Sequence, residues 1–172
     1  INLVGSAINA SAIISGIDFA RTAAANGQIV QTTSGDLTLA STGNINAGTL
    51  LSAGRLGAAG TTVTAIAMTA HGDMTLAGAI NVNSQILSSG NVLISGQSLS
   101  VQTLVAGIDF SGTNAAGGNI VLGQTGDLTV ATSGVVTAPT IQAAGTTDIR
   151  AAAVTSDAIT GHKDITVADT SG

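Results

Sequence analysis

A short pattern that recurs along the chain constrains its fold more than any other feature of the sequence. Glycine is followed by aspartate or asparagine, then by an apolar residue, in most copies a small polar residue, and a second apolar residue. The copies begin at Gly35, Gly72, Gly90 and Gly126, and a degenerate copy begins at Lys163. A pattern that returns at a regular spacing indicates stacked repeats, because each unit buries its apolar side against the next one.

The length of the unit follows from the first apolar position of each copy. These positions lie about 18 or 19 residues apart, within the range of known solenoid units. They are Phe19, Leu37, Leu56, Met74, Val92, Phe110, Leu128, Thr147 and Ile165. The spacing predicts about nine coils of 18–19 residues, of which the Leu56 and Thr147 copies fit the pattern least well.

A longer repeat is superimposed on the short one. Residues 16–81 align with residues 107–172 without a gap. Matching segments are Gly16-Ile17-Asp18-Phe19 with Gly107-Ile108-Asp109-Phe110, and His71-Gly72-Asp73 with His162-Lys163-Asp164. We interpret this as the duplication of five units at once. Because the chain begins in mid-pattern with Ile1 and shows no signal peptide, we expect residues 1–172 to be a single β-helix segment, an internal fragment of a larger protein.

Alternation of apolar and small polar residues sets the type of secondary structure. Leu37 and Leu39 show the period of two that is typical of strands, and each unit is too short for a β-α-β crossover. Two further sets of apolar residues predict the other strands of each unit. They are Ile80, Val82, Leu99, Val101 and Val136, and then Leu50, Ile66, Met68, Ile86, Leu104, Ile141 and Ile159. The predicted fold is all-β, a right-handed parallel β-helix.

Composition excludes several classes of function. Aromatic residues make up 1% and charged residues 8% of the chain, which has a net charge of −5. The four cations are far apart in sequence, so we expect no nucleic-acid partner. Without cysteine there is neither a disulfide nor a thiolate metal site.

A column of aspartate and asparagine residues follows from the repeat. Its members are Asp18, Asp36, Asp73, Asn91, Asp109, Asp127 and Asp164. We interpret it as turn chemistry, in which these side chains bond the backbone two residues on, rather than as a calcium ladder, which needs denser carboxylates. The threonines that follow, among them Thr38 and Thr75, fit strand propensity better than an ice-binding face, because the column is interrupted. We therefore expect no metal and no cofactor.

Two histidines, His71 and His162, are the remaining candidates for chemistry. They hold equivalent places five units apart, which is too far for a shared proton relay or metal. Asp73 and Asp164 lie two residues beyond them, so each histidine is expected to make a local surface contact with its aspartate. Since no third member of a triad is evident, we expect no catalytic residue and no enzymatic activity.

The units Gly35-Asp36-Leu37-Thr38-Leu39 and Ser89-Gly90-Asn91-Val92-Leu93-Ile94, with Ala-Gly turns such as Ser52-Ala53-Gly54, resemble the haemagglutinin repeats of filamentous haemagglutinin-type exoproteins. The resemblance covers nearly the whole chain. It implies a β-helical shaft that leaves a Gram-negative bacterium through a dedicated outer-membrane two-partner transporter. It also implies a role in adhesion, biofilm formation or contact-dependent toxin delivery.

From the repeat and the resemblance we expect a structural and adhesive shaft segment of a large adhesin, secreted or held at the bacterial cell surface. Through the full-length protein it would attach to receptors or glycans of host cells or bacteria. The alternatives are the shaft of a contact-dependent growth-inhibition protein and a glycan-binding or ice-binding solenoid. Exposed terminal rungs invite strand pairing, so we also expect the isolated segment to associate end to end.

Overall fold

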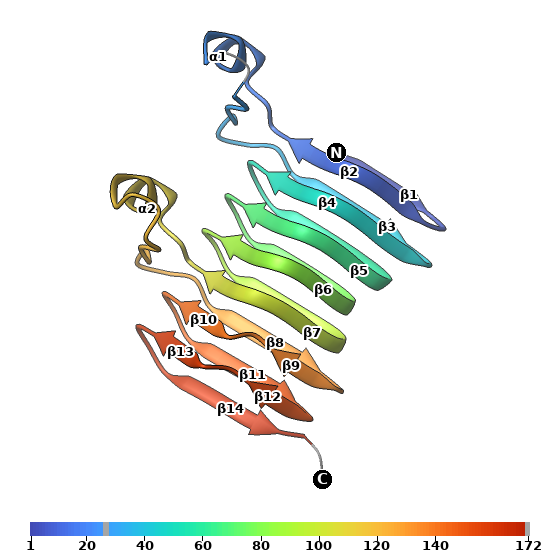
Figure 1. Ribbon diagram of the computed structural model, residues 1–172, viewed down its shortest axis with the longest axis vertical. Coiled ribbons are helices and arrows are strands. Elements are labelled where there is room, and N and C mark those ends of the chain that lie inside the picture. Colours follow the sequence, from blue (N-terminus) through green and yellow to red (C-terminus); the bar gives the residue numbers. More distant parts are fainter. Residues whose placement is uncertain (26–27, 171–172) are drawn as a thin grey trace.

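The computed structural model describes residues 1–25 and 28–170, and it is an all-β solenoid with 62% of residues in strands and 7% in helices. The chain winds through about seven stacked turns, and parallel pairing joins its strands into one sheet (Figure 1). The predicted parallel β-helix is confirmed. We call each turn of the solenoid a rung.

Most rungs use either a long bent strand or a set of shorter ones. The elements are β1 (Asn2–Gly5) and β2 (Ile8–Ser15) in the first rung, β3 (Leu37–Ser41) and β4 (Asn44–Ser52) in the second, then β5 (Leu56–Ala70), β6 (Met74–Ser88) and β7 (Val92–Ala106). The sixth rung holds β8 (Leu128–Thr132), β9 (Val135–Thr137) and β10 (Thr140–Ala143), and the seventh β11 (Thr147–Ala151), β12 (Ala153–Thr155) and β13 (Ala158–Gly161). Strand β14 (Ile165–Asp169) starts another turn.

Apolar columns along the axis explain why these residues form strands. Strand pairing places Leu37, Leu56 and Met74 in one column, which continues through Val92, Leu128 and Thr147. All of these side chains are buried, while their strand neighbours point outward. Small aliphatic residues therefore fill a narrow core without aromatic rings. The other predicted columns are also buried, except for Ile159, which is partly buried, and Ile66, which lies outward and is 56% exposed.

Two of the nine expected units leave the solenoid instead of adding a rung. Val92 at the start of β7 pairs directly with Leu128 at the start of β8, so the chain between the end of β7 and β8 is an excursion. We name residues 16–36 the first excursion and residues 107–127 the second. They contain the short helices α1 (Phe19–Ala24) and α2 (Phe110–Ala115), and both project from the same edge of the rod (Figure 1). The turns number about seven because α1 begins at Phe19 and α2 at Phe110, where the repeat predicts the strands of two further rungs.

Helix capping explains the departure from the repeat. The Asp18 side chain accepts a hydrogen bond from the Arg21 N–H, and that of Asp109 accepts one from the Gly112 N–H, each at 2.9 Å. Aspartate at this position satisfies an N–H that a helix start leaves without a partner. The two aspartates expected to mark strand turns are therefore N-caps of helices.

The core consists of one long cluster and one small satellite. The long cluster follows the interior of the rungs from Ile8 to Ala151. The satellite lies outside the rungs, beneath the second excursion, where Phe110, Ile120 and Leu122 pack on the buried residues Leu87, Val105 and Ile108. Among the described helices, none has the length and apolar character needed to span a membrane.

Candidate functional site

The Asp/Asn column forms a ladder along the outside of the rod. Asp73 Oδ1 accepts the Asn91 N–H at 2.9 Å, and Asn91 Oδ1 accepts the Asp127 N–H at 2.9 Å. Asp127 Oδ1 in turn accepts the Thr146 N–H at 2.8 Å. Each side chain thus bonds the backbone of the following rung, and not the backbone two residues on as the sequence had predicted. The ladder adds side-chain bonds to the backbone bonds that join successive rungs there, such as the bond from the Met74 N–H to the Asn91 carbonyl at 2.8 Å.

In one rung an arginine, Arg55, occupies the position that holds Asp or Asn in most of the other rungs. Asp36 Oδ1 accepts the Arg55 N–H at 2.8 Å, but the Arg55 side chain has no acceptor for the next rung. Its Nε instead lies 4.0 Å from Asp73 Oδ2, with both side chains largely exposed. Since water screens such a pair, it contributes little to stability. Within residues 1–25 and 28–170, no group of three or more His, Cys, Asp or Glu side chains is placed to hold a metal ion.

A polar hollow lies beside this ion pair. Gly57 occupies the outward column between Thr38 and Thr75 and leaves space there. The hollow has a volume of about 420 Å³, and Asp36, Thr38, Arg55, Leu56, Gly57, Asp73 and Thr75 line it. It is open to solvent, and its lining carries two carboxylates, Asp36 and Asp73, and one guanidinium, Arg55. The threonine column is interrupted here, as the sequence indicates.

The two histidines lie in equivalent turns on one edge of the rod. Four rungs separate them, not five, because an excursion intervenes. At about 4.8 Å a rung they are roughly 19 Å apart along the axis, so no chemistry can join them. His71 makes no hydrogen bond or ion pair with Asp73, contrary to expectation. Its ring stacks on Phe110, with centroids 4.5 Å apart and an angle of 15° between the planes. Burial lowers the pKa of His71.

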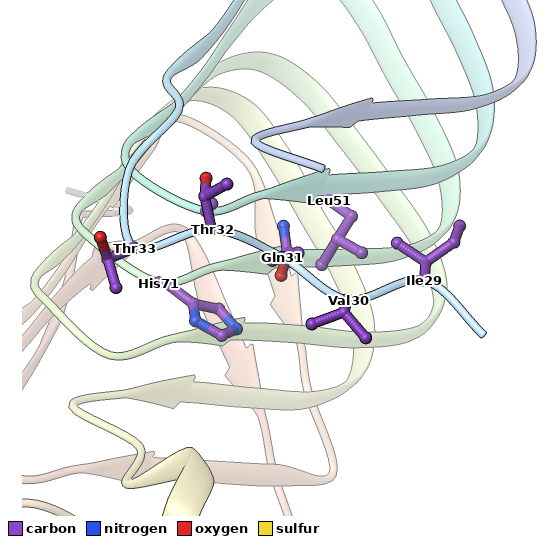
Figure 2. Close-up of a pocket in the computed structure, with 8 residues that line it drawn as sticks. Ile29, Val30, Gln31, Thr32, Thr33, Leu51 and His71 are labelled. Carbon is purple, nitrogen blue, oxygen red and sulfur yellow. The ribbon is translucent and has the colours of Figure 1, made fainter. Parts of the chain in front are cut away.

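A shallow groove lies between the first excursion and the rod. The returning segment of the first excursion, residues 29–33, forms one wall, and Leu51, Ala53 and His71 form the rest. Figure 2 shows His71 and Leu51 on either side of this segment. The volume is about 550 Å³, and His71 is the only ionisable side chain in the lining.

The same local hydrogen bonds shape both excursions. In the first, the Thr22 hydroxyl accepts the Val30 N–H, and in the second the Thr113 hydroxyl accepts the Val121 N–H, both at 3.0 Å. A single antiparallel bridge closes each excursion, from Ile17 to Gln31 and from Ile108 to Leu122. The excursions are therefore built alike, 91 residues apart, at positions that the long repeat makes equivalent.

Comparison with known proteins adds no family name. No family model matches the chain, and neither a curated protein nor a solved structure does.

Sequence reasoning missed the contact between His71 and Phe110. The residues are 39 positions apart, and the repeats to which they belong give no sign of a contact between them. A weak signal exists for the excursion itself, since an aspartate precedes each phenylalanine and can cap a helix. The contact arises only because the second excursion folds back over two preceding rungs.

Proposed function

We propose that this chain is a structural and adhesive shaft segment of a large secreted surface protein of the filamentous haemagglutinin type. The observation that carries the proposal is the unbroken parallel pairing of rungs from β1 to β14. Each inner rung is hydrogen-bonded on both sides along the axis, so the chain forms a rod that further rungs can extend without changing its cross-section.

Rod geometry supports the proposed mechanical role. At about 4.8 Å a rung, seven turns give a rod roughly 34 Å long. Strand hydrogen bonds run nearly parallel to the axis, so a pull along it acts on many bonds at once. The Asp/Asn ladder adds further axial bonds at the turns. A shaft that holds an adhesive tip away from a cell needs such resistance.

The surface of the rod suits exposure to solvent without many charges. Outward strand positions carry mostly small hydroxyl, amide and alanine side chains, and both excursions project from one edge. Such projections are the places where a regular rod can display distinct contact surfaces. The resemblance to haemagglutinin repeats supports an adhesive role and export through an outer-membrane transporter.

The test is to find the parent polypeptide with an antibody raised against residues 1–172. We expect it in the medium or on intact cells, as a product much larger than the 16.5 kDa of this chain. Protease added to intact cells should remove the signal, while a cytoplasmic marker serves as the control. A free cytoplasmic product of 16.5 kDa would refute the proposal.

A second measurement separates adhesion from toxin delivery. Cells lacking the parent gene are compared with parental cells for attachment to host cells and for inhibition of neighbouring bacteria. Loss of attachment alone supports the adhesin, and loss of neighbour inhibition alone replaces it with the toxin-delivery shaft. Fab fragments against residues 1–172 then test whether this segment itself contacts the receptor.

A further inference from the structure

The second excursion is attached to the rod in two different ways. At its base, the Gly107 N–H bonds the Gly90 carbonyl at 3.0 Å and the Ile108 N–H bonds the Ser88 carbonyl at 2.9 Å. Beyond the base, residues 109–125 make no hydrogen bond to a rung. Their bonds close within the excursion, such as the 2.8 Å bond from the Asp109 N–H to the Val121 carbonyl. We call residues 109–125 the strap.

The strap contacts the rungs only through apolar side chains and one pair of stacked rings. These contacts are the satellite cluster over Leu87 and Val105 and the stack of Phe110 on His71. This cluster is much smaller than the main core, and segments with few buried apolar contacts open at a lower free energy than the whole fold. The strap can therefore part from the rod while the rungs stay paired.

His71 is the ionisable group at this contact. It lies in the turn between β5 and β6, and the strap reaches it from the end of β7. The nearby turns hold Asp73 and Arg55, which pair with each other at 4.0 Å, and the start of α2 holds Asp109, which caps the helix. The returning segment of the first excursion, residues 29–33, carries no charged side chain. These charges are either balanced or engaged.

We propose that the strap is an acid-released latch, which parts from the rod when His71 gains a proton and so uncovers Leu87 and Val105. Both residues are at most 8% exposed when the strap is in place. Their release would expose an apolar patch on the outer face of adjacent rungs. The inference goes beyond the shaft function and does not depend on it.

The sign of the effect follows from the surroundings of His71. Burial disfavours the imidazolium and lowers the pKa of His71. A group whose pKa is lower in the docked state stabilises docking above its ordinary pKa and loses that contribution as the pH falls through the docked value. Attraction between the cation and the Phe110 ring acts in the opposite direction, so the latch requires that burial outweigh this attraction.

Hydrogen–deuterium exchange of the whole chain tests the latch. Exchange is measured between pH 5 and 8, and protection factors correct for the intrinsic effect of pH. We expect protection of the Thr113 and Val121 amides to fall on acidification, while that of the β6 amides does not change. In His71→Phe, which keeps a stacked ring without a titrating group, protection should be independent of pH. His162→Phe is the matched control and should behave as the unmodified chain.

Two results would overturn the proposal. One is strap protection that does not change with pH in the unmodified chain, and the other is an equal fall in His71→Phe. A titration of the His71 ring by NMR gives a second criterion. His71 should have a pKa below the ordinary value for histidine, and Phe110→Leu should raise it. If the His71 pKa lies at or above the ordinary value, acid strengthens the contact and the latch does not exist.

Discussion

Replacing Thr147 by valine should stabilise the protein, because this residue places a hydroxyl in an apolar column. Thr147 pairs with Leu128 on one side and Ile165 on the other. Its side chain is fully buried, and the hydroxyl oxygen has no hydrogen-bond partner. Thr147→Val replaces that hydroxyl with a methyl group of similar size and leaves the strand otherwise unchanged.

The size of the effect follows from desolvation. A buried hydroxyl without a partner costs about 1–3 kcal/mol, and valine removes this cost while keeping the β-branched shape. We expect Thr147→Val to raise the free energy of unfolding by about 1–2 kcal/mol, which is roughly a 2–8 °C rise in Tm for a chain of this size. Thr147→Ser keeps the hydroxyl and loses a methyl group, so it should destabilise by about 1 kcal/mol.

Urea unfolding followed by circular dichroism measures the change as a shift in midpoint at constant slope. Thr132→Val is the matched control. Thr132 is 5% exposed, but its hydroxyl bonds the Gly134 carbonyl at 3.3 Å. The same substitution there removes a hydrogen bond, and we expect a loss of about 0.5–1.5 kcal/mol. If Thr147→Val lowers the midpoint, or both variants shift it equally, then the orphan hydroxyl is not a source of instability.

Two further predictions concern the turns, and both can be checked by the same urea unfolding. Gly126→Ala should destabilise the protein by at least about 2 kcal/mol, since Gly126 has φ +146° and a Cβ there would collide with the backbone of Gly107. Gly57→Ala is the control, because a Cβ at Gly57 has open space, and it should change stability by less than about 0.5 kcal/mol. Asp127→Ala removes the acceptor of the Thr146 N–H and should lower the free energy of unfolding by about 1 kcal/mol. Asp157→Ala removes a side chain that makes no such bond and should leave the free energy of unfolding almost unchanged. Equal losses in the two variants would show that the ladder does not stabilise the rod.

The rungs can be predicted from the sequence because the alternation of apolar and polar residues that defines each strand is local. Alternation of Leu37 with Leu39, and of Met74 with Leu76, identifies a strand and its buried face without knowledge of the partner strand. The roughly 18-residue spacing then requires stacking, since each unit alone leaves its apolar side exposed. Thr147 shows how strong this rule is, because the column places it inside the core even though it is polar.

The sequence wrongly predicts a rung at each excursion, because the apolar positions there have the spacing of the other units. Residues 16–36 are only slightly longer than one unit, and Asp18-Phe19 resembles the Asp-Leu of a strand start. For α1 the following residues, Ala20 to Ala24, include good helix formers. For α2 the sequence Ser111-Gly112-Thr113-Asn114 favours a helix poorly. That helix therefore depends on its Asp109 cap and on the packing of Phe110.

The sequence by itself determined the fold class, the direction of stacking and the inward-facing columns, because these depend on a period-two pattern repeated along one axis. Only the tertiary structure decided which units are rungs, where the Asp/Asn side chains bond, and what His71 contacts. These features depend on segments that meet after the chain has wound around the rod. Distances across rungs are set by the number of turns between two residues, and no local pattern records where the winding is interrupted.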